Sequence, residues 1–153
     1  MIKGLYEAHL PVKDLKNSII FYENLGLELA WQSETVAFFW IVKGESWLGL
    51  WEGEEYKTPY APSLRHVAFT IDYNDMKNAV EWLRNKGISA VPFGNRTSVE
   101  PFVRPYQGNA SVYFKDLDGN SLEFMCYIEV PDHLKDINEH RSLQEWEKRL
   151  AES

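Results

Sequence analysis

The sequence predicts an α+β fold: two paired βαβββ modules that form a curved mixed sheet around a cleft, with the helices on its outer face. The chain repeats itself, because the pattern that starts at His9 recurs from His66. Four residues of the first copy have counterparts about sixty residues later: Asp14 with Asp75, Lys16 with Lys77, Asn17 with Asn78, and Gly26 with Gly87. In each copy a strand pattern leads to a helical one, and β-branched and aromatic segments follow. One helix over a small sheet leaves the opposite face uncovered, so two such units are expected to pair.

The first module, about residues 5–53, opens with a predicted strand at 5–12. A helix follows from about Asp14, the predicted N-cap, and Gly26 is the predicted stop. Three apolar residues at helical spacing form its expected buried stripe: Leu15, Ile19 and Tyr22. The remaining strands are expected at residues 28–32, 36–42 and 47–51.

The second module, about residues 64–127, repeats this order. A strand at 65–71 leads to a helix at about 74–85, which carries Met76, Val80 and Leu83 on one face and ends at Gly87. Three more strands are expected, near 89–92, 110–114 and 121–127, with a tight Asp-Gly turn between the last two.

One domain is expected to span residues 1–130, followed by a C-terminal tail at 131–153. Ser142 and Glu145 form a capping box that opens a short helix at 143–150. Its apolar face is expected to dock on the body of the chain or on a partner.

Composition excludes several kinds of partner. The net charge is −7 and the basic residues are scattered, which argues against nucleic acid and anionic membrane. No run has the length of a membrane span, and no leader pattern opens the chain. The single cysteine, Cys126, forms no internal disulfide, is expected in the core, and favours a reducing cytoplasm.

Three side chains predict a metal site in the cleft: His9, His66 and Glu123. Side chains alternate faces along a strand, and each of these opposes the bulky apolar residues that a helix would cover. Two imidazoles and a carboxylate suit a divalent ion such as Zn, Mn, Ni or Fe. Gly49 stands in the first module where Glu123 stands in the second. Three protein ligands would therefore leave open positions, as catalytic sites do.

The same residues also fit a structure without metal. A histidine on a strand is often a hydrogen-bonded structural residue, and Glu123 could instead pair with Arg65 or Arg104. Residues 94–109 are expected to form a loop. As a lid this loop would carry the guanidinium of Arg96 or Arg104 to an anionic substrate; otherwise it is a solvated connection.

Three motifs resemble the vicinal-oxygen-chelate superfamily, which includes glyoxalase I, fosfomycin-resistance thiol transferases, extradiol dioxygenases and bleomycin-binding proteins. They span about residues 5–127: His9-x-x-Val-x-Asp-Leu-x-x-Ser-x-x-Phe-Tyr-x-x-Leu-Gly-Leu, His66-Val-Ala-Phe, and Tyr113-Phe-x-Asp-x-Asp-Gly-Asn-x-Leu-Glu123. By this resemblance His9, His66 and Glu123 match the family's metal ligands. A homodimer is also implied, because paired subunits in many members each contribute ligands to one site.

The resemblance also assigns candidate roles. Trp47 and Tyr113 match positions that line the pocket of the fosfomycin-resistance enzymes, although ordinary aromatic packing would explain them equally well. The candidate catalytic residues are Glu123 and Tyr113, and the candidate substrate contacts are Trp47, Gly49, Tyr113 and Arg104.

The implied function is that of a divalent-metal-dependent glyoxalase-like enzyme, a lyase or a thiol transferase. It would act on a small substrate with adjacent oxygens, in the second case with a thiol cosubstrate. Gly49 removes a carboxylate that glyoxalase I carries. Val103 and Asp132 take the places of cationic groups that clamp a phosphonate, which argues against fosfomycin. Two alternatives remain: a metal-free sequestering protein of the bleomycin-resistance type, and an Fe(II) extradiol-type dioxygenase.

Overall fold

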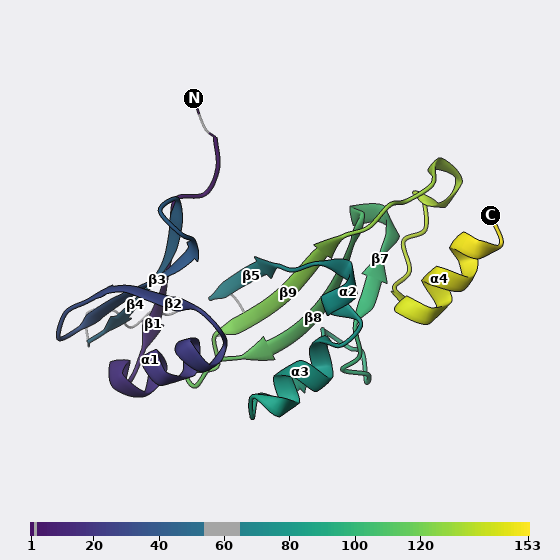
Figure 1. Cartoon of the computed structure of the whole chain (residues 1–153). Coiled ribbons are helices and arrows are strands. Elements are labelled where there is room, and N and C mark those ends of the chain that lie inside the picture. Colours follow the sequence, from purple (N-terminus) through teal and green to yellow (C-terminus); the bar gives the residue numbers. More distant parts are fainter. Residues whose placement is uncertain (2, 54–64) are drawn as a thin grey trace. The chain divides into compact units, whose positions relative to one another are not determined.

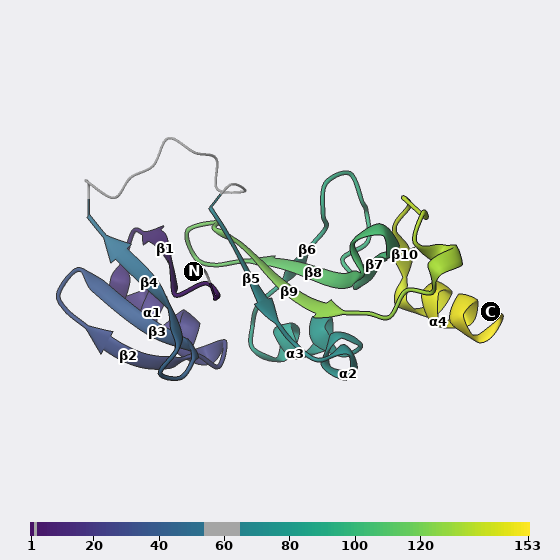
Figure 2. The same cartoon turned by 90° about the horizontal axis from the view of Figure 1, so that it is seen from above.

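A computed structural model of the chain describes residues 1, 3–53 and 65–153 in two compact units (Figures 1 and 2). The N-terminal unit comprises Met1–Val67 and Lys115–Ser121, and the second unit comprises Ala68–Phe114 and Leu122–Ser153. Residue 64, where the second module is expected to begin, lies outside the described residues. The α+β class is confirmed.

The N-terminal unit holds a four-stranded sheet and one helix, in the predicted βαβββ order. Its elements are β1 (Glu7–Val12), α1 (Leu15–Asn24), β2 (Glu28–Gln32), β3 (Val36–Val42) and β4 (Ser46–Glu52). The strand order is β1-β4-β3-β2, in which β1 runs parallel to β4 and the other neighbours are antiparallel. The core side of the sheet carries fully buried residues that include Phe39, Leu48 and Leu50.

Both predicted ends of α1 are confirmed. The Asp14 carboxylate accepts a hydrogen bond from the Asn17 backbone N–H at 3.0 Å, which caps the helix. Gly26 follows the last turn with φ of 104°, a conformation that residues with a Cβ rarely adopt. The helix buries Leu15 and Tyr22.

The Asp-Gly turn between β8 (Asn109–Lys115) and β9 (Ser121–Tyr127) belongs to the N-terminal unit. The Tyr22 hydroxyl donates to the buried Asp116 carboxylate at 2.8 Å, and Asn120 Nδ2 donates to the Pro11 carbonyl at 3.0 Å. Burial first, and then the charge of Asp116, raise the pKa of Tyr22 well above its ordinary value. The turn therefore anchors both the helix and β1 of the first module.

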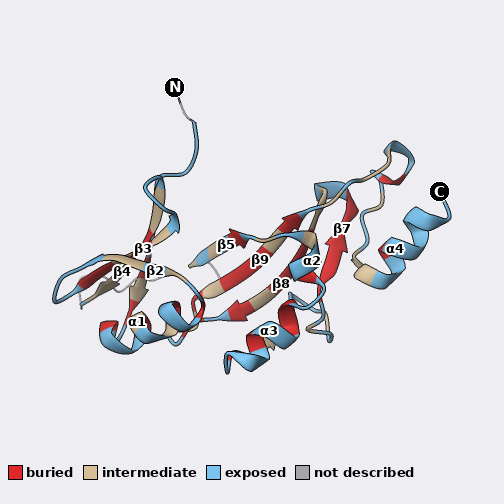
Figure 3. Cartoon of the chain, in the orientation of Figure 1, coloured by how far each residue is buried: buried red, intermediate tan, exposed pale blue. Residues whose placement is uncertain are grey.

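A six-stranded sheet, three α-helices and two short 3-10 helices (η) follow. They are β5 (His66–Thr70), α2 (Tyr73–Met76), α3 (Ala79–Asn85), β6 (Ala90–Val91), β7 (Phe102–Arg104), η3 (Pro105–Gln107), β8 (Asn109–Lys115), β9 (Ser121–Tyr127), η4 (Asp132–Leu134), β10 (Arg141–Ser142) and α4 (Leu143–Ala151). The strand order is β10-β7-β8-β9-β5, and β6 pairs with β8. Buried residues concentrate along β7, β8 and β9, whereas α4 is mostly exposed (Figure 3).

Two expectations for this part of the chain are wrong. The helix expected at 74–85 is interrupted between α2 and α3, because Asn78 has φ −111° and ψ 5° and its side chain donates to the Asn74 carbonyl at 3.4 Å. Residues 94–109 are not simply a loop, since they contain β7, whose residues are all buried. Arg104 is therefore an interior residue and not the tip of a lid.

The C-terminal tail packs on the second unit. β10 pairs with β7, the capping box of Ser142 and Glu145 is formed, and Trp146 of α4 is 1% exposed. Glu147 accepts from Lys77 at 2.6 Å and from the Tyr73 hydroxyl at 3.1 Å. Helix α4 therefore docks on the body of its own chain, which is one of the two alternatives expected from the sequence. None of the helices in the described residues is long and apolar enough to cross a membrane.

Candidate metal and substrate site

His9 lies on β1 directly beside Gly49 of β4, on the face opposite to the buried Leu10 and Val12. Its Nε2 is 3.3 Å from a Glu7 carboxylate oxygen. Its ring centroid is 5.3 Å from that of Trp51 and, edge to face, 5.9 Å from that of another aromatic ring, Phe38. The predicted orientation of His9, away from the helix-covered core, is confirmed.

Gly49 of β4 lies directly against these rings. A Cβ at this position would lie 2.8 Å from His9 Cδ2, 3.0 Å from Phe38 Cε1 and 3.1 Å from Trp51 Nε1. Contacts this short do not occur without movement of the neighbouring side chains. Glycine therefore allows the imidazole and two aromatic rings to pack closely over β4.

Trp47 belongs to the same aromatic face. Its ring stacks on Trp40 with centroids 5.1 Å apart and lies 4.7 Å from the Phe38 ring. Its indole Nε1 donates to Glu7 at 2.7 Å. Glu7 is thus held by both Trp47 and His9, so an acidic group stands at the edge of an aromatic surface.

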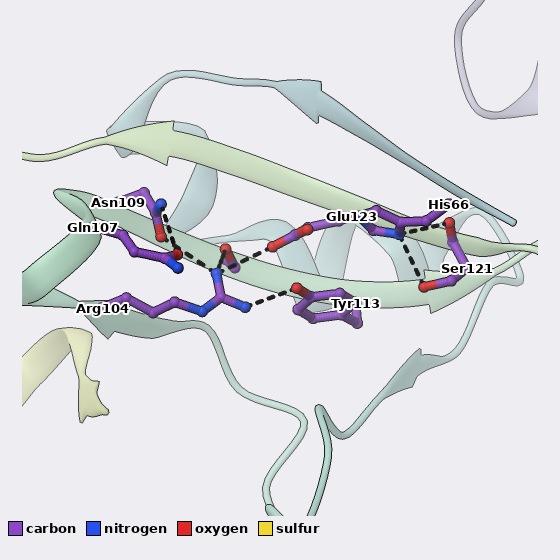
Figure 4. Close-up of polar contacts among 8 residues, drawn as sticks. His66, Arg104, Gln107, Asn109, Tyr113, Ser121 and Glu123 are labelled. Atoms are coloured by element: carbon purple, nitrogen blue, oxygen red, sulfur yellow. Dashed lines mark hydrogen bonds and ion pairs between the residues drawn. The ribbon is translucent and has the colours of Figure 1, made fainter. Parts of the chain in front are cut away.

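His66 begins β5, and its ring is oriented by Ser121 of β9. The imidazole Nδ1 lies 3.0 Å from the Ser121 carbonyl oxygen and 3.1 Å from its hydroxyl oxygen (Figure 4). A proton on Nδ1 that is donated to this carbonyl places the ring's lone pair on Nε2. Metal-binding histidines commonly make this contact through the nitrogen that does not bind the metal.

Glu123 lies on β9 and is 3% exposed. Its carboxylate accepts from the Arg104 guanidinium at 3.3 Å, so one of the two ion pairs considered for it is formed. Arg104 also donates to the Ser111 hydroxyl at 2.6 Å and to the Tyr113 hydroxyl at 2.7 Å (Figure 4). The strands β7, β8 and β9 each contribute side chains to this cluster, and burial strengthens the pairing.

Tyr113 stays protonated at neutral pH. Burial first, and then the hydrogen bond and charge of Glu123, raise its pKa to about 12, while Arg104 acts in the opposite direction. The hydroxyl is therefore a hydrogen-bond donor and not a base.

Val103, one of the two residues that stand in place of the phosphonate-clamping cations, is buried in β7. Its neighbour Arg104 sends a guanidinium to Tyr113 and Glu123. The interpretation that Val103 and Asp132 argue against fosfomycin stays a prediction. Sequence inspection missed Ser111, although its side chain has the same strand parity as Tyr113.

The structure brings Arg104, Tyr113 and Glu123 together, and separately His9 with Gly49. Within residues 1, 3–53 and 65–153, no three His, Cys, Asp or Glu side chains are grouped closely enough to hold a metal ion. The set of His9, His66 and Glu123 stays a prediction.

Comparisons with known proteins agree with this fold. A family model described as the Glyoxalase/Bleomycin resistance protein/Dioxygenase superfamily matches residues 4–124. The metallothiol transferase FosB of Staphylococcus haemolyticus is 35% identical over 127 residues, which are 80% of this chain and 83% of the relative.

Two solved structures are also similar. An integron cassette protein, HFX_CASS4, from the mobile metagenome of the Halifax Harbour sewage outfall has a TM-score of 0.64 at 27% identity, and the match covers 82% of this chain and 99% of that one. The fosfomycin resistance protein FosX of Listeria monocytogenes, complexed with Mn(II) and sulfate, has a TM-score of 0.58 at 25% identity, and the match covers 88% of this chain and 96% of that one. The chain belongs to the glyoxalase/bleomycin resistance protein/dioxygenase superfamily.

Proposed function

We propose that this protein is a divalent-metal-dependent thiol transferase that joins a thiol to a small oxygen-bearing electrophile. The similarity to a protein named metallothiol transferase over 80% of the chain supports the reaction class. The observation that carries the proposal in this structure is the buried Glu123 carboxylate, which lies beside the protonated Tyr113 hydroxyl and the Arg104 guanidinium.

The proposed metal ligands are His9, His66 and Glu123. Their donor chemistry suits a divalent first-row ion, and the Nδ1 contact of His66 with Ser121 is the contact expected of an oriented ligand. The solved FosX with Mn(II) gives a precedent among the similar structures. When bound, the ion would polarise an oxygen of the electrophile.

We further propose a homodimer in which paired subunits contribute ligands to one site. The resemblance to the superfamily supports this proposal, because paired subunits in many of its members each contribute ligands to one site. His9 Nε2 lies 3.3 Å from the half-exposed Glu7 carboxylate, a contact that a metal ion would readily replace.

The remaining residues have defined roles in this proposal. The thiolate sulfur attacks an electrophilic carbon, a C–S bond forms, and a C–O bond of the electrophile breaks. The Tyr113 hydroxyl gives its proton to the departing oxygen and recovers the proton that the thiol released. Arg104 positions Tyr113 and balances the charge of Glu123.

A metal-free sequestering protein is the second candidate. The stacked Trp40 and Trp47 rings and the nearby Phe38 favour it, since a flat ligand could bind on them without any metal. The two functions differ in their need for His66.

Metal content decides between them. We expect about one divalent ion per chain in untagged protein, loss of that ion in His66→Ala, and retention in His133→Ala, which removes an exposed histidine of the tail. Thermal unfolding of each variant serves as the folding control. A parent protein that takes up no Zn, Mn, Ni or Fe contradicts the proposal and favours the sequestering protein. A metal-loaded parent is then assayed for thiol loss with epoxides and other electrophiles.

A further inference from the structure

A second group of cationic and aromatic side chains lies in the second unit, and the proposed reaction does not use it. We call it the His140 cluster: Phe93, Arg96, Phe102 and His140. A turn positions the first two residues, because the Arg96 backbone N–H donates to the Phe93 carbonyl at 3.0 Å and Gly94 has φ of 54°. Phe102 comes from β7, and His140 comes from the tail directly before β10.

The cluster is built around the Phe102 ring, whose residue is 2% exposed. The Arg96 guanidinium carbon lies 4.4 Å from its centroid, and the His140 ring centroid lies 4.8 Å from it. The Arg104 guanidinium carbon is 4.8 Å from the same centroid. The His140 cluster therefore adjoins the Arg104 and Tyr113 pair through one shared ring. Phe93, which is 37% exposed, forms its outer edge.

The charges of this region do not balance. Arg104 has Glu123 as its counter-ion, but Arg96 has no carboxylate at ion-pair distance in the part of the chain that the structure describes, and its Nε is buried without a hydrogen-bond partner there. Burial first, and then the charges of Arg104 and Arg96, lower the pKa of His140. A protein with a net charge of −7 thus gathers two guanidinium groups and an imidazole around one ring.

The pKa of one carboxylate, that of Glu145, is lowered first by its hydrogen bonds with Ser142 and to a smaller extent by the charge of Arg96, so this carboxylate already has other hydrogen-bond partners. Because Glu145 closes the capping box of α4, it is not available as a direct counter-ion. An anion from outside the chain would supply the missing partner.

The tail holds His140 in place. Ser142 is registered against Phe102 and Arg141 against Val103, and the buried Trp146 fixes α4 a few residues further on. The match to the family model ends at residue 124, before the tail begins.

We propose that Arg96 and His140 bind an anionic group, a carboxylate or a phosphoryl group, carried by one of the two reactants. The identity of the reactant rests on the proposed transferase function, whereas the anion site itself does not. The guanidinium donates to the anion, His140 donates from its ring N–H, and Phe93 shields the contact from water. The C-terminal tail is then a specificity-determining part of the substrate site.

Histidine ring signals in NMR spectra test the site without any catalysis. The chain has four histidines, and His140→Gln identifies the signal of interest. Inorganic phosphate added to chelator-treated protein should shift the His140 signal to saturation and leave that of the exposed His133 unchanged. We expect about tenfold weaker phosphate binding in Arg96→Gln, as for the loss of one charge-assisted hydrogen bond.

Arg149→Gln is the matched control, because it removes the same charge from an exposed position of α4. It should bind phosphate as the parent does. A His140 signal that does not move, or equal phosphate affinity in Arg96→Gln and the parent, overturns the anion site.

Steady-state kinetics of the metal-loaded enzyme then identify the reactant. Arg96→Gln should raise one KM about tenfold with little change in kcat. A raised KM for the thiol assigns the anion to the thiol, and a raised KM for the electrophile assigns it to the electrophile. If neither KM rises, the assignment to a reactant is wrong. A parent without transferase activity would refute the proposed function and leave the phosphate result standing.

Discussion

The Arg104 guanidinium and the Glu123 carboxylate form an ion pair at 3.3 Å, and their side chains are 5% and 3% exposed. Removing two charges from water is unfavourable, and their attraction offsets this only when further hydrogen bonds satisfy them. Arg104 makes such bonds to Ser111 and Tyr113. The pair therefore links three neighbouring strands, and its two members depend on each other for stability.

Loss of one charged side chain of the Arg104–Glu123 pair should destabilise the folded protein. We expect Arg104→Met to lower the free energy of unfolding by about 3–5 kcal/mol, because Glu123 would remain buried without its cation. The double variant Arg104→Met, Glu123→Leu should lose much less. Urea unfolding of chelator-treated protein measures both. Lys43→Met, which breaks the exposed pair with Glu28, is the control and should change little. Equal losses in the single and double variants would show that the charge left behind is not the cause.

Gly49→Ala should disturb the aromatic face of the N-terminal unit. The new methyl group would lie 2.8 Å from His9 Cδ2, so the imidazole must move. Overpacking of this kind lowers the free energy of unfolding by about 1–3 kcal/mol. Gly4→Ala is the matched control, since no heavy atom lies within 4 Å of the added carbon. Urea unfolding and near-UV circular dichroism check the effect, and two variants of equal stability would refute it.

Trp146→Ala should release the tail. The side chain is 1% exposed, and its removal is expected to lower the free energy of unfolding by about 3–5 kcal/mol. Limited proteolysis should then cut the segment after β9 faster than in the parent. Leu150→Ala, at a position 36% exposed on the same helix, should leave cleavage nearly unchanged. An intact tail in Trp146→Ala would mean that β10 and the Glu147 contacts hold it without this side chain.

Stability above pH 10 should report on Tyr113. Its pKa is raised from 10.0 to about 12 in the folded protein, so the folded state keeps the proton more strongly. The contribution to stability is fully present below pH 10 and is lost as the pH rises towards 12. Tyr73 behaves similarly, so the comparison must be with Tyr113→Phe. Urea unfolding across this range should give a steeper decline in the parent. Parallel declines would contradict the assignment.

The sequence predicted best where local rules act without competition. The bounds of β2, β3 and β9 agree with the expected strands, and the capping residues of α1 and α4 were recognised because side-chain caps are short-range signals. Strand alternation also separated His9 correctly from the buried Leu10 and Val12.

What the sequence did not predict depends on distant partners. β7 is three residues long, and only its pairing with β8 and β10 makes Phe102–Arg104 a strand. Arg104 looked like a surface residue because its counter-ion is nineteen positions away on another strand. The tail strand β10 was not predicted for the same reason, because its pairing partner β7 is distant in the sequence.

The bond between Tyr22 and Asp116 spans 94 positions of sequence. The first copy of the sequence repeat is therefore not a unit that can be excised from the chain. A fragment that stops at Val67 would keep every strand of the first sheet and lose residues 115–121, leaving a buried hydroxyl without its acceptor. The first module thus completes its native packing only once the turn that carries Asp116 and Asn120 has been synthesised.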